Sequence, residues 1–377
     1  MKPASFVGLA WFSPGNNRLE KEKRMRKQDF KVRPMRVIVR PKSAAERGHR
    51  SRAIMPKRKA LAPGLPPTPE HDLIFNGGKT IANLSFTNFY VGGSGAWNQN
   101  DIQFIDSGLS AAMSDQNLNN VMVQYYPGGQ ISSNFLGSQV LAGPPPAVVS
   151  QGDVENLVTS LFNAGQLDNL DLTSTVLNFM LPSGTILNTD AAPTTAAITA
   201  RLERPRAQAQ KPAVAHSAAI PVEEEENSTQ GLGGYHGSIH VGAAPQTTVY
   251  YAVGVYSEQL ADGTTNGIPV FDQAWKNVVA TFYHELNEAR TDPDVEDAIR
   301  AGNDPNAVKF LGWTSQQGEE CGDFPVFEAN PLTEVFQEVP VTDGSRTVPV
   351  QFQYSDAVHG PEGPVGKPEV LNQAATA

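Results

Sequence analysis

Residues 271–290 constrain the fold more than any other part of the chain, because their apolar side chains recur with the period of an α-helix. The apolar positions follow the spacing i, i+3, i+4, i+7 and i+11 and comprise Trp275, Val278, Val279, Phe282 and Leu286. At about 3.6 residues per turn, these side chains form one stripe that must pack against a core. The chain is therefore expected to build a layered domain around this helix.

The face opposite the apolar stripe carries the sequence His-Glu-Leu-Asn-Glu at positions 284–288. His284 and Glu288 are four residues apart, so they share one face of the helix. Zinc binds imidazole nitrogen and carboxylate oxygen at about 2.0–2.2 Å, and two side chains one turn apart are able to chelate one ion. Glu285 is then placed to act as general base toward water, as in zinc proteases with a His-Glu-x-x-His helix.

Two alternatives accompany this interpretation. Glu288 stands where the zinc-protease motif has histidine. A carboxylate in that position also suits more oxygen-tolerant metals, so Ca²⁺ and Mn²⁺ are alternatives to zinc. A His-Glu-x-x-Glu sequence on a surface helix is equally compatible with a solvated charged face that binds no metal.

Four further residues are candidate metal ligands. Asp294 follows His284 by ten residues, the spacing at which one class of zinc proteases places its third ligand; the alternative is an acidic helix end. Glu320 and Asp323 belong to an acidic loop that is able to return to the helix, and the alternative is a solvated turn. His236 precedes a β-prone run and is a candidate for the same cleft, although a structural or exposed histidine is the simpler explanation.

Helical and strand-like periodicities alternate along the rest of the chain and indicate an α/β (α+β) domain with a mixed sheet. Besides 271–290, they predict helices at 101–114 and 150–164 and strands at 81–91, 120–126, 173–180, 238–241, 247–256 and 348–354. Pro349 indicates that the last strand lies at a sheet edge, because proline has no N–H to donate to a neighbour.

Composition divides the chain into a predicted domain and three predicted disordered or low-complexity segments. Residues 1–70 form a basic leader, since residues 1–60 hold 18 of the 29 Lys and Arg residues. Residues 194–229 are rich in Ala, Pro and Glu and are predicted to be a linker or surface insertion. Residues 361–377 are predicted to be a disordered tail, which leaves 71–360 as a single domain.

The composition also limits the class of protein. Cys321 is the only cysteine, so an intrachain disulfide and a cysteine zinc cluster are excluded. The sequence contains no apolar run long enough to span a bilayer, and the short apolar stretch at 4–12 makes a poor signal peptide. The basic leader is expected to be solvated. Nucleic-acid binding is the alternative, and it has little support because no aromatic residues are interleaved with the basic ones.

Several of these motifs together resemble the Exordium (phosphate-induced) family and its microbial zinc-protease-like relatives. The resemblance covers about residues 73–360 and is most specific in the helix at 284–293 and the loop at 312–323. Weaker similarity lies in Tyr-His-Gly at 235–237, Tyr-Ala-Val at 251–253, and the segments 87–93 and 350–356. The resemblance implies a zincin-like domain with an active-site helix, and secretion or a place in the cell envelope.

The residues and the resemblance together predict a metal-dependent hydrolase, most simply a zinc peptidase acting on peptides or proteins. In this prediction, His284 and Glu288 bind the metal, Glu285 is the general base, and Glu320 or Asp323 completes the site. The alternative is a non-catalytic extracellular or envelope binding protein of the Exordium type that keeps a metal for structure.

Overall fold

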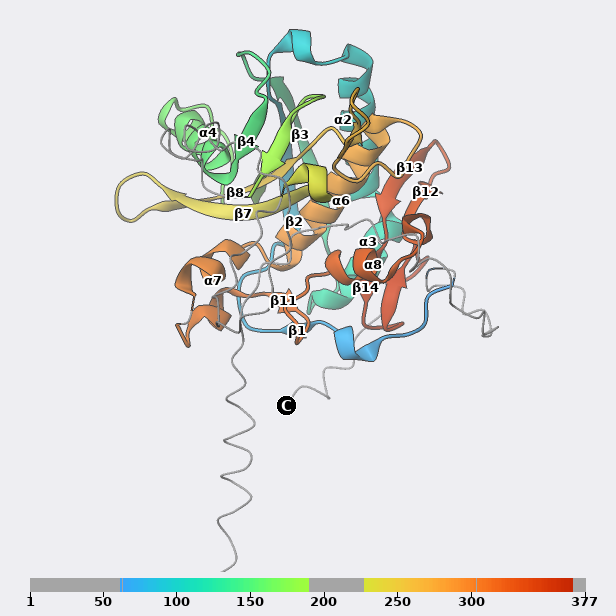
Figure 1. Cartoon of the computed structure of the whole chain (residues 1–377). Helices are drawn as coiled ribbons and strands as arrows, with labels where there is room; N and C mark the ends of the chain where they lie inside the picture. The colour runs from blue at the N-terminus through green and yellow to red at the C-terminus, as the bar shows by residue number, and fades with distance from the viewer. Residues whose placement is uncertain (1–61, 63, 190–226, 303, 369–377) are drawn as a thin grey trace, which may run out of the picture.

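The computed structural model describes residues 62, 64–189, 227–302 and 304–368, and a five-stranded mixed sheet lies at its centre (Figure 1). The strand order is β3-β2-β5-β8-β7. The strands are β2 (Asn83–Tyr90), β3 (Ser132–Val140), β5 (Thr175–Met180), β7 (Gly234–Val241) and β8 (Thr247–Gly254). Neighbouring strands are parallel except for β7, which pairs with β8 in the antiparallel sense at one edge. The predicted mixed α/β architecture is confirmed.

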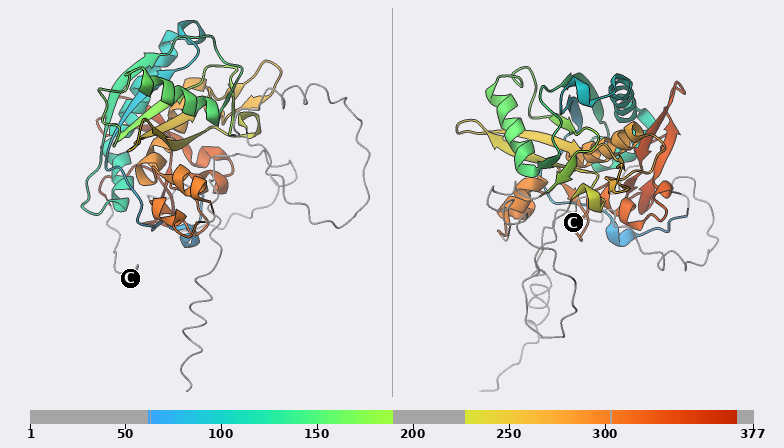
Figure 2. Two further views of the ribbon diagram at one scale, coloured as in Figure 1. Left: turned by 90° about the vertical axis from the view of Figure 1, so that its left-hand side faces the viewer. Right: turned by 45° about the horizontal axis from the view of Figure 1, so that its top comes forward.

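Helices cover both faces of this sheet, as Figures 1 and 2 show. On one face, α2 (Gln99–Ser114) and α6 (Ala274–Thr291) pack on apolar side chains of β2, β5 and β8. On the other face, α4 (Gln151–Asn163) packs on the alternate side chains of the same strands. The alternation follows from the pleat, which points successive residues to opposite faces. Phe86 therefore faces α2 and α6, whereas Phe89 faces α4.

The helix predicted at 271–290 is α6. It is more completely buried than a surface helix with one exposed polar face would be. Every residue from Asn277 to Thr291 is buried. The sheet covers its apolar stripe, and the hairpin of β12 (Phe336–Pro340) and β13 (Thr347–Gln351) packs beside it. The side chain of Asn277 accepts hydrogen bonds from the backbone N–H groups of Val270 and Phe271, which fixes the entry of the chain into the helix.

Short elements complete the domain. The remaining strands pair as β1 (Ile74–Phe75) with β11 (Trp313–Thr314), β4 (Val148–Ser150) with β6 (Ile186–Asn188), β9 (Glu258–Gln259) with β10 (Thr265–Asn266), and β14 (Gln353–Ser355) with β15 (Gly360–Glu362). The remaining α-helices are α3 (Gln116–Met122), α7 (Val295–Ala301) and α8 (Asp323–Glu328). The 3₁₀ helices are η2 (Pro69–His71), η3 (Ser94–Ala96), η4 (Val123–Tyr125), η5 (Ser228–Gln230), η6 (Ala307–Phe310) and η7 (Leu332–Glu334).

Two secondary-structure predictions need correction, and one strand of the central sheet was not predicted. The strand predicted at 120–126 is wrong: α3 and η4 occupy this region, and the Asp115 side chain caps α3 by accepting a hydrogen bond from Leu118 N. The strand predicted at 348–354 is interrupted at Phe352, which separates β13 from β14. Sequence periodicity missed β3 entirely, because its residues are mostly polar or small and none is fully buried.

The described residues also extend past the predicted domain limits. Ala62 and Leu65 are buried in the main core, although residues up to 70 were assigned to the leader. Ser228 is fully buried, so the insertion ends earlier than residue 229. Pro361 pairs with Tyr354, so the predicted tail begins inside a strand. Of the predicted leader, insertion and tail, residues 1–61, 63, 194–226 and 369–377 lie outside the described residues.

No helix within the described ranges is long and apolar enough to cross a membrane.

Gly312 holds the segment before α8 tightly against the end of α6. Its N–H donates to Asp292 Oδ1 at 2.8 Å, and a Cβ at this position would lie 2.0 Å from Thr291 O and 3.0 Å from Lys79 O. These neighbours are backbone atoms, which cannot rotate away. Only glycine therefore allows the loop to approach the helix so closely.

Replacing Gly312 with alanine should destabilise the protein. Overpacking against fixed backbone typically costs about 1–3 kcal/mol. Gly95→Ala is the matched control, because nothing lies within 4 Å of a Cβ built there. Denaturant unfolding of both variants should show a lower free energy of unfolding for Gly312→Ala alone. Equal stability of the two variants would contradict the close approach.

Candidate metal centre

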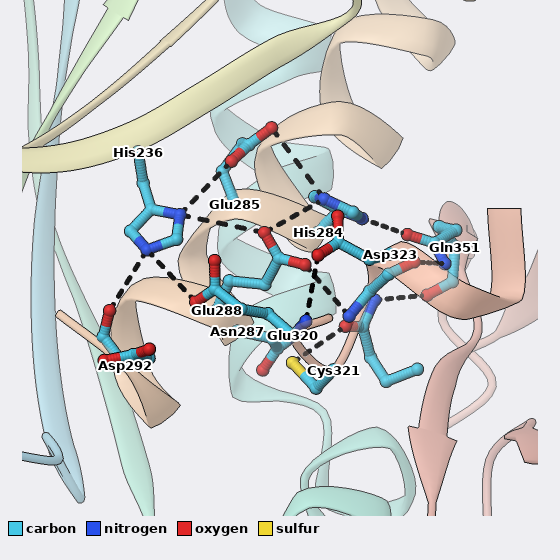
Figure 3. A network of polar contacts seen from close by, with 12 residues as sticks. His236, His284, Glu285, Asn287, Glu288, Asp292, Glu320, Cys321, Asp323 and Gln351 are labelled. Atoms are coloured by element: carbon cyan, nitrogen blue, oxygen red, sulfur yellow. Dashed lines mark hydrogen bonds and ion pairs between the residues drawn. The ribbon is translucent and has the colours of Figure 1, made fainter. Parts of the chain in front are cut away.

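Helix α6 presents His284 and Glu288 one turn apart, as predicted, but both side chains are buried. His284 Nε2 lies 3.1 Å from Glu288 Oε2 and 3.9 Å from Glu285 Oε1, and each of the three side chains is at most 3 % exposed. Figure 3 shows these groups facing one another in the interior. The explanation as a solvated charged face is therefore wrong.

A neighbouring glutamine sets the orientation of the His284 ring. Gln351 Nε2 donates to Gly322 O at 2.9 Å and to Phe352 O at 2.8 Å, so its Oε1 is left as an acceptor. His284 Nδ1 carries the proton and donates it to this Oε1 in a short hydrogen bond. Nε2 consequently points at the carboxylates. Metal-binding histidines are typically oriented in this way by an acceptor on the second ring nitrogen.

The acidic loop packs directly over His284 and Glu288. Gly322 N donates to Glu288 Oε1 at 3.0 Å, and a Cβ at Gly322 would lie 2.2 Å from His284 Nδ1. The loop folds on itself through Asp323 Oδ2, which accepts a hydrogen bond from Glu320 N at 2.9 Å. This close packing brings the predicted residues Glu320 and Asp323 to the helix.

His236 enters from strand β7 on the other side. Its Nδ1 lies 3.5 Å from Glu285 Oε2 and 3.7 Å from Glu288 Oε2, and its Nε2 lies 3.5 Å from Glu320 Oε1. Nε2 also donates to the backbone carbonyl of Asp292 at 3.2 Å. The His236 ring therefore lies between Glu320 on one side and the two glutamates of α6 on the other.

We call the space between these side chains the acidic chamber. It is formed by His236, His284, Glu285, Glu288, Asp292, Glu320 and Asp323, all at most 6 % exposed. Several of its polar atoms have no hydrogen-bond partner among the described residues: His284 Nε2, Glu285 Oε1, Asp292 Oδ2, Glu320 Oε1 and Asp323 Oδ1. Unpartnered buried polar atoms are costly, so their concentration here indicates a missing partner.

The separations in the chamber fit donors that share a cation better than direct ion pairs. Charge-assisted hydrogen bonds from nitrogen to carboxylate are about 2.7–2.9 Å long. Two donors bound to one tetrahedral ion with bonds of about 2.0–2.1 Å lie about 3.3 Å apart. The nitrogen–oxygen distances involving Glu288, at 3.1 and 3.7 Å, bracket the second value. The donor set therefore fits a divalent metal ion.

The electrostatics of the chamber also favour a cation. Burial raises the pKa of Glu285, Glu320 and Asp323, and it raises that of Asp292 to about 7. Burial alone would lower the pKa of His284, but the charges of Glu288 and Glu285 outweigh it and raise the pKa to about 10.

His236 shows the same balance. Burial lowers its pKa, and Glu285 and Glu288 more than compensate, so the pKa is raised. Within the described part of the chain, no lysine or arginine forms an ion pair with the chamber carboxylates. The negative charge therefore needs protons or a metal ion to offset it.

Two predicted ligands, Asp294 and Asp323, join neither group of three potential metal donors. Asp294 interacts with Tyr250 and Lys79, and Asp323 lies in the chamber and accepts a hydrogen bond from Glu320 N. Conversely, Gln351 and Gly322 position His284 but did not stand out in the sequence. Both residues are uncharged. Each acts through a contact with a residue of α6 that is more than 30 positions away in the sequence, so local periodicity does not indicate their role.

Comparison of the chain with known proteins found no related protein. The chain matches no protein-family model, no curated protein and no solved structure. The resemblance to the Exordium family therefore stays a prediction that depends on the motifs themselves.

Gln351→Met should destabilise the protein, because it leaves the buried N–H of His284 without its acceptor. The expected loss in free energy of unfolding is about 1–3 kcal/mol. Gln337→Met is the control, since Gln337 is partly exposed and its side chain bonds only to Thr333 O. That variant should stay within about 0.5 kcal/mol of the wild type. Equal losses in the two variants would remove the proposed role of Gln351.

Proposed function

We propose that this protein is a divalent-metal-dependent hydrolase with a zincin-like active-site helix, acting on peptide bonds. The observation that carries the proposal is the arrangement on α6: His284 Nε2 and Glu288 Oε2 are 3.1 Å apart, and Glu285 lies beside them. Zinc suits this mixed nitrogen and oxygen donor set, and Mn²⁺ is compatible with it too.

Each residue has a distinct role in this proposal. His284 and Glu288 hold the metal, and Gln351 and Gly322 fix their orientation through the hydrogen bonds to His284 Nδ1 and Glu288 Oε1. When bound, a divalent metal supplies Lewis acidity, which polarises a carbonyl group and makes water more acidic. Glu285 accepts the proton of the attacking water through its free Oε1 and returns it to the leaving amine.

The resemblance to zinc-protease relatives supports a peptide or protein as the substrate.

A second candidate function is a binding protein in which the metal only stabilises the fold. The burial of the chamber favours it: His284, Glu285 and Glu288 are each 2 % exposed or less. A hydrolase with this site has to open to admit a substrate, whereas a structural metal benefits from complete enclosure.

Removal of His284 tests the metal. Purified wild-type protein should contain a divalent metal, and His284→Ala should contain less of it, because an imidazole donor and its orienting hydrogen bond are both lost. His240→Ala is the matched control, since His240 lies on the same strand as His236 but is exposed and pairs with Asp297. Equal metal content in wild type and His284→Ala would refute the metal site.

Removal of the base distinguishes the two functions. Glu285→Gln should retain metal while peptidase activity on a mixture of unstructured peptides falls by about 10²–10⁴-fold. Undiminished activity in this variant would exclude Glu285 as the base. If the wild type cleaves nothing and His284→Ala lowers the melting temperature, the structural role of the metal is supported instead.

A further inference from the structure

The two histidines of the acidic chamber lie on opposite sides of the same two carboxylates, as Figure 3 shows. Both His284 and His236 face Glu288 Oε2, at 3.1 and 3.7 Å, and both face Glu285. Two groups of potential metal donors result. One contains His284, Glu285 and Glu288, the other contains His236, Glu288 and Glu320, and Glu288 belongs to both.

A single ion cannot bind both imidazoles in this arrangement. Within each group, the donor atoms lie within 4.8 Å of one another, and no such group in the described chain contains both histidines. Two nitrogens bound to one ion by bonds of about 2.0–2.1 Å are at most about 4.2 Å apart. His284 and His236 therefore define two separate positions for a cation.

The charge of the chamber leads to the same conclusion. Its five carboxyl groups are all at most 5 % exposed, and one divalent cation offsets only part of their charge. Glu320 Oε1 and Asp292 Oδ2, on the His236 side, remain without hydrogen-bond partners among the described residues. Two histidines with four or more carboxylates is the donor set of carboxylate-bridged two-metal sites.

We propose that the acidic chamber binds two divalent cations, one held by His284 and Glu288 and the other by His236 and Glu320, with the Glu288 carboxylate shared between them. The first position is that of the proposed function, so this inference rests on it. Two cations about 3.5–4 Å apart stabilise both the attacking and the leaving atom of a displacement. Glu285 faces both positions and would act as general base for a water molecule between them.

Metal stoichiometry tests this inference. The full-length protein is stripped of metal, reloaded with Mn²⁺ or Zn²⁺, dialysed and measured for ions bound per chain. The wild type should bind two ions, and Glu320→Gln and His284→Ala should each bind one. His240→Ala, as control, should keep two. Electron paramagnetic resonance of the Mn²⁺-loaded wild type should show exchange coupling between the two ions, which requires no variant to fold.

The outcomes separate this inference from the proposed function. One ion in the wild type, retained by Glu320→Gln and without exchange coupling, would overturn the second position but keep the first. No bound ion in the wild type would overturn both. Two uncoupled ions that survive Glu320→Gln would place the second ion outside the chamber and also overturn the inference.

Discussion

The burial of five carboxyl groups around two imidazoles is the constraint on which the rest of this structure depends. Isolated charges are costly to bury, and paired ones remain stable only if their partners are well aligned. Of the five nitrogen–carboxylate separations in the acidic chamber, four are 3.5–3.9 Å, longer than a typical N–H···O hydrogen bond, and the fifth, from His284 Nε2 to Glu288 Oε2, is 3.1 Å. We propose that metal ions between these groups supply the compensating positive charge.

The architecture explains how so much negative charge is held together. Helix α6 contributes two glutamates and a histidine, the edge strand β7 contributes His236, the loop before α8 contributes Glu320, and the first residue of α8 is Asp323. Apolar packing of α6 against the sheet and the β12–β13 hairpin stabilises this arrangement. Gly312 and Gly322 allow the loop to approach α6 more closely than any side chain would permit. The hydrophobic core thus supports an electrostatically unfavourable site.

The helix and three residues around it, His236, Glu320 and Asp323, were predictable, but the contacts that orient them were not. Residues 271–290 show strong helical periodicity, and the four-residue spacing of His284 and Glu288 fixes their common face. The segment 120–126 was misassigned to a strand because a short apolar run has no readable period, and its helix depends on a cap further upstream. Gln351 could not be predicted, because its role depends on the hydrogen bond to His284, which lies on a helix distant in sequence.

The central claim is that a divalent cation compensates the charge of the acidic chamber. Thermal unfolding of the metal-free protein in increasing Zn²⁺ or Mn²⁺ tests it most directly. A cation that binds only the folded state should stabilise it progressively, by about 2.7 kcal/mol at a concentration 100 times the dissociation constant. A melting temperature that does not change over the whole range of either metal would contradict the account.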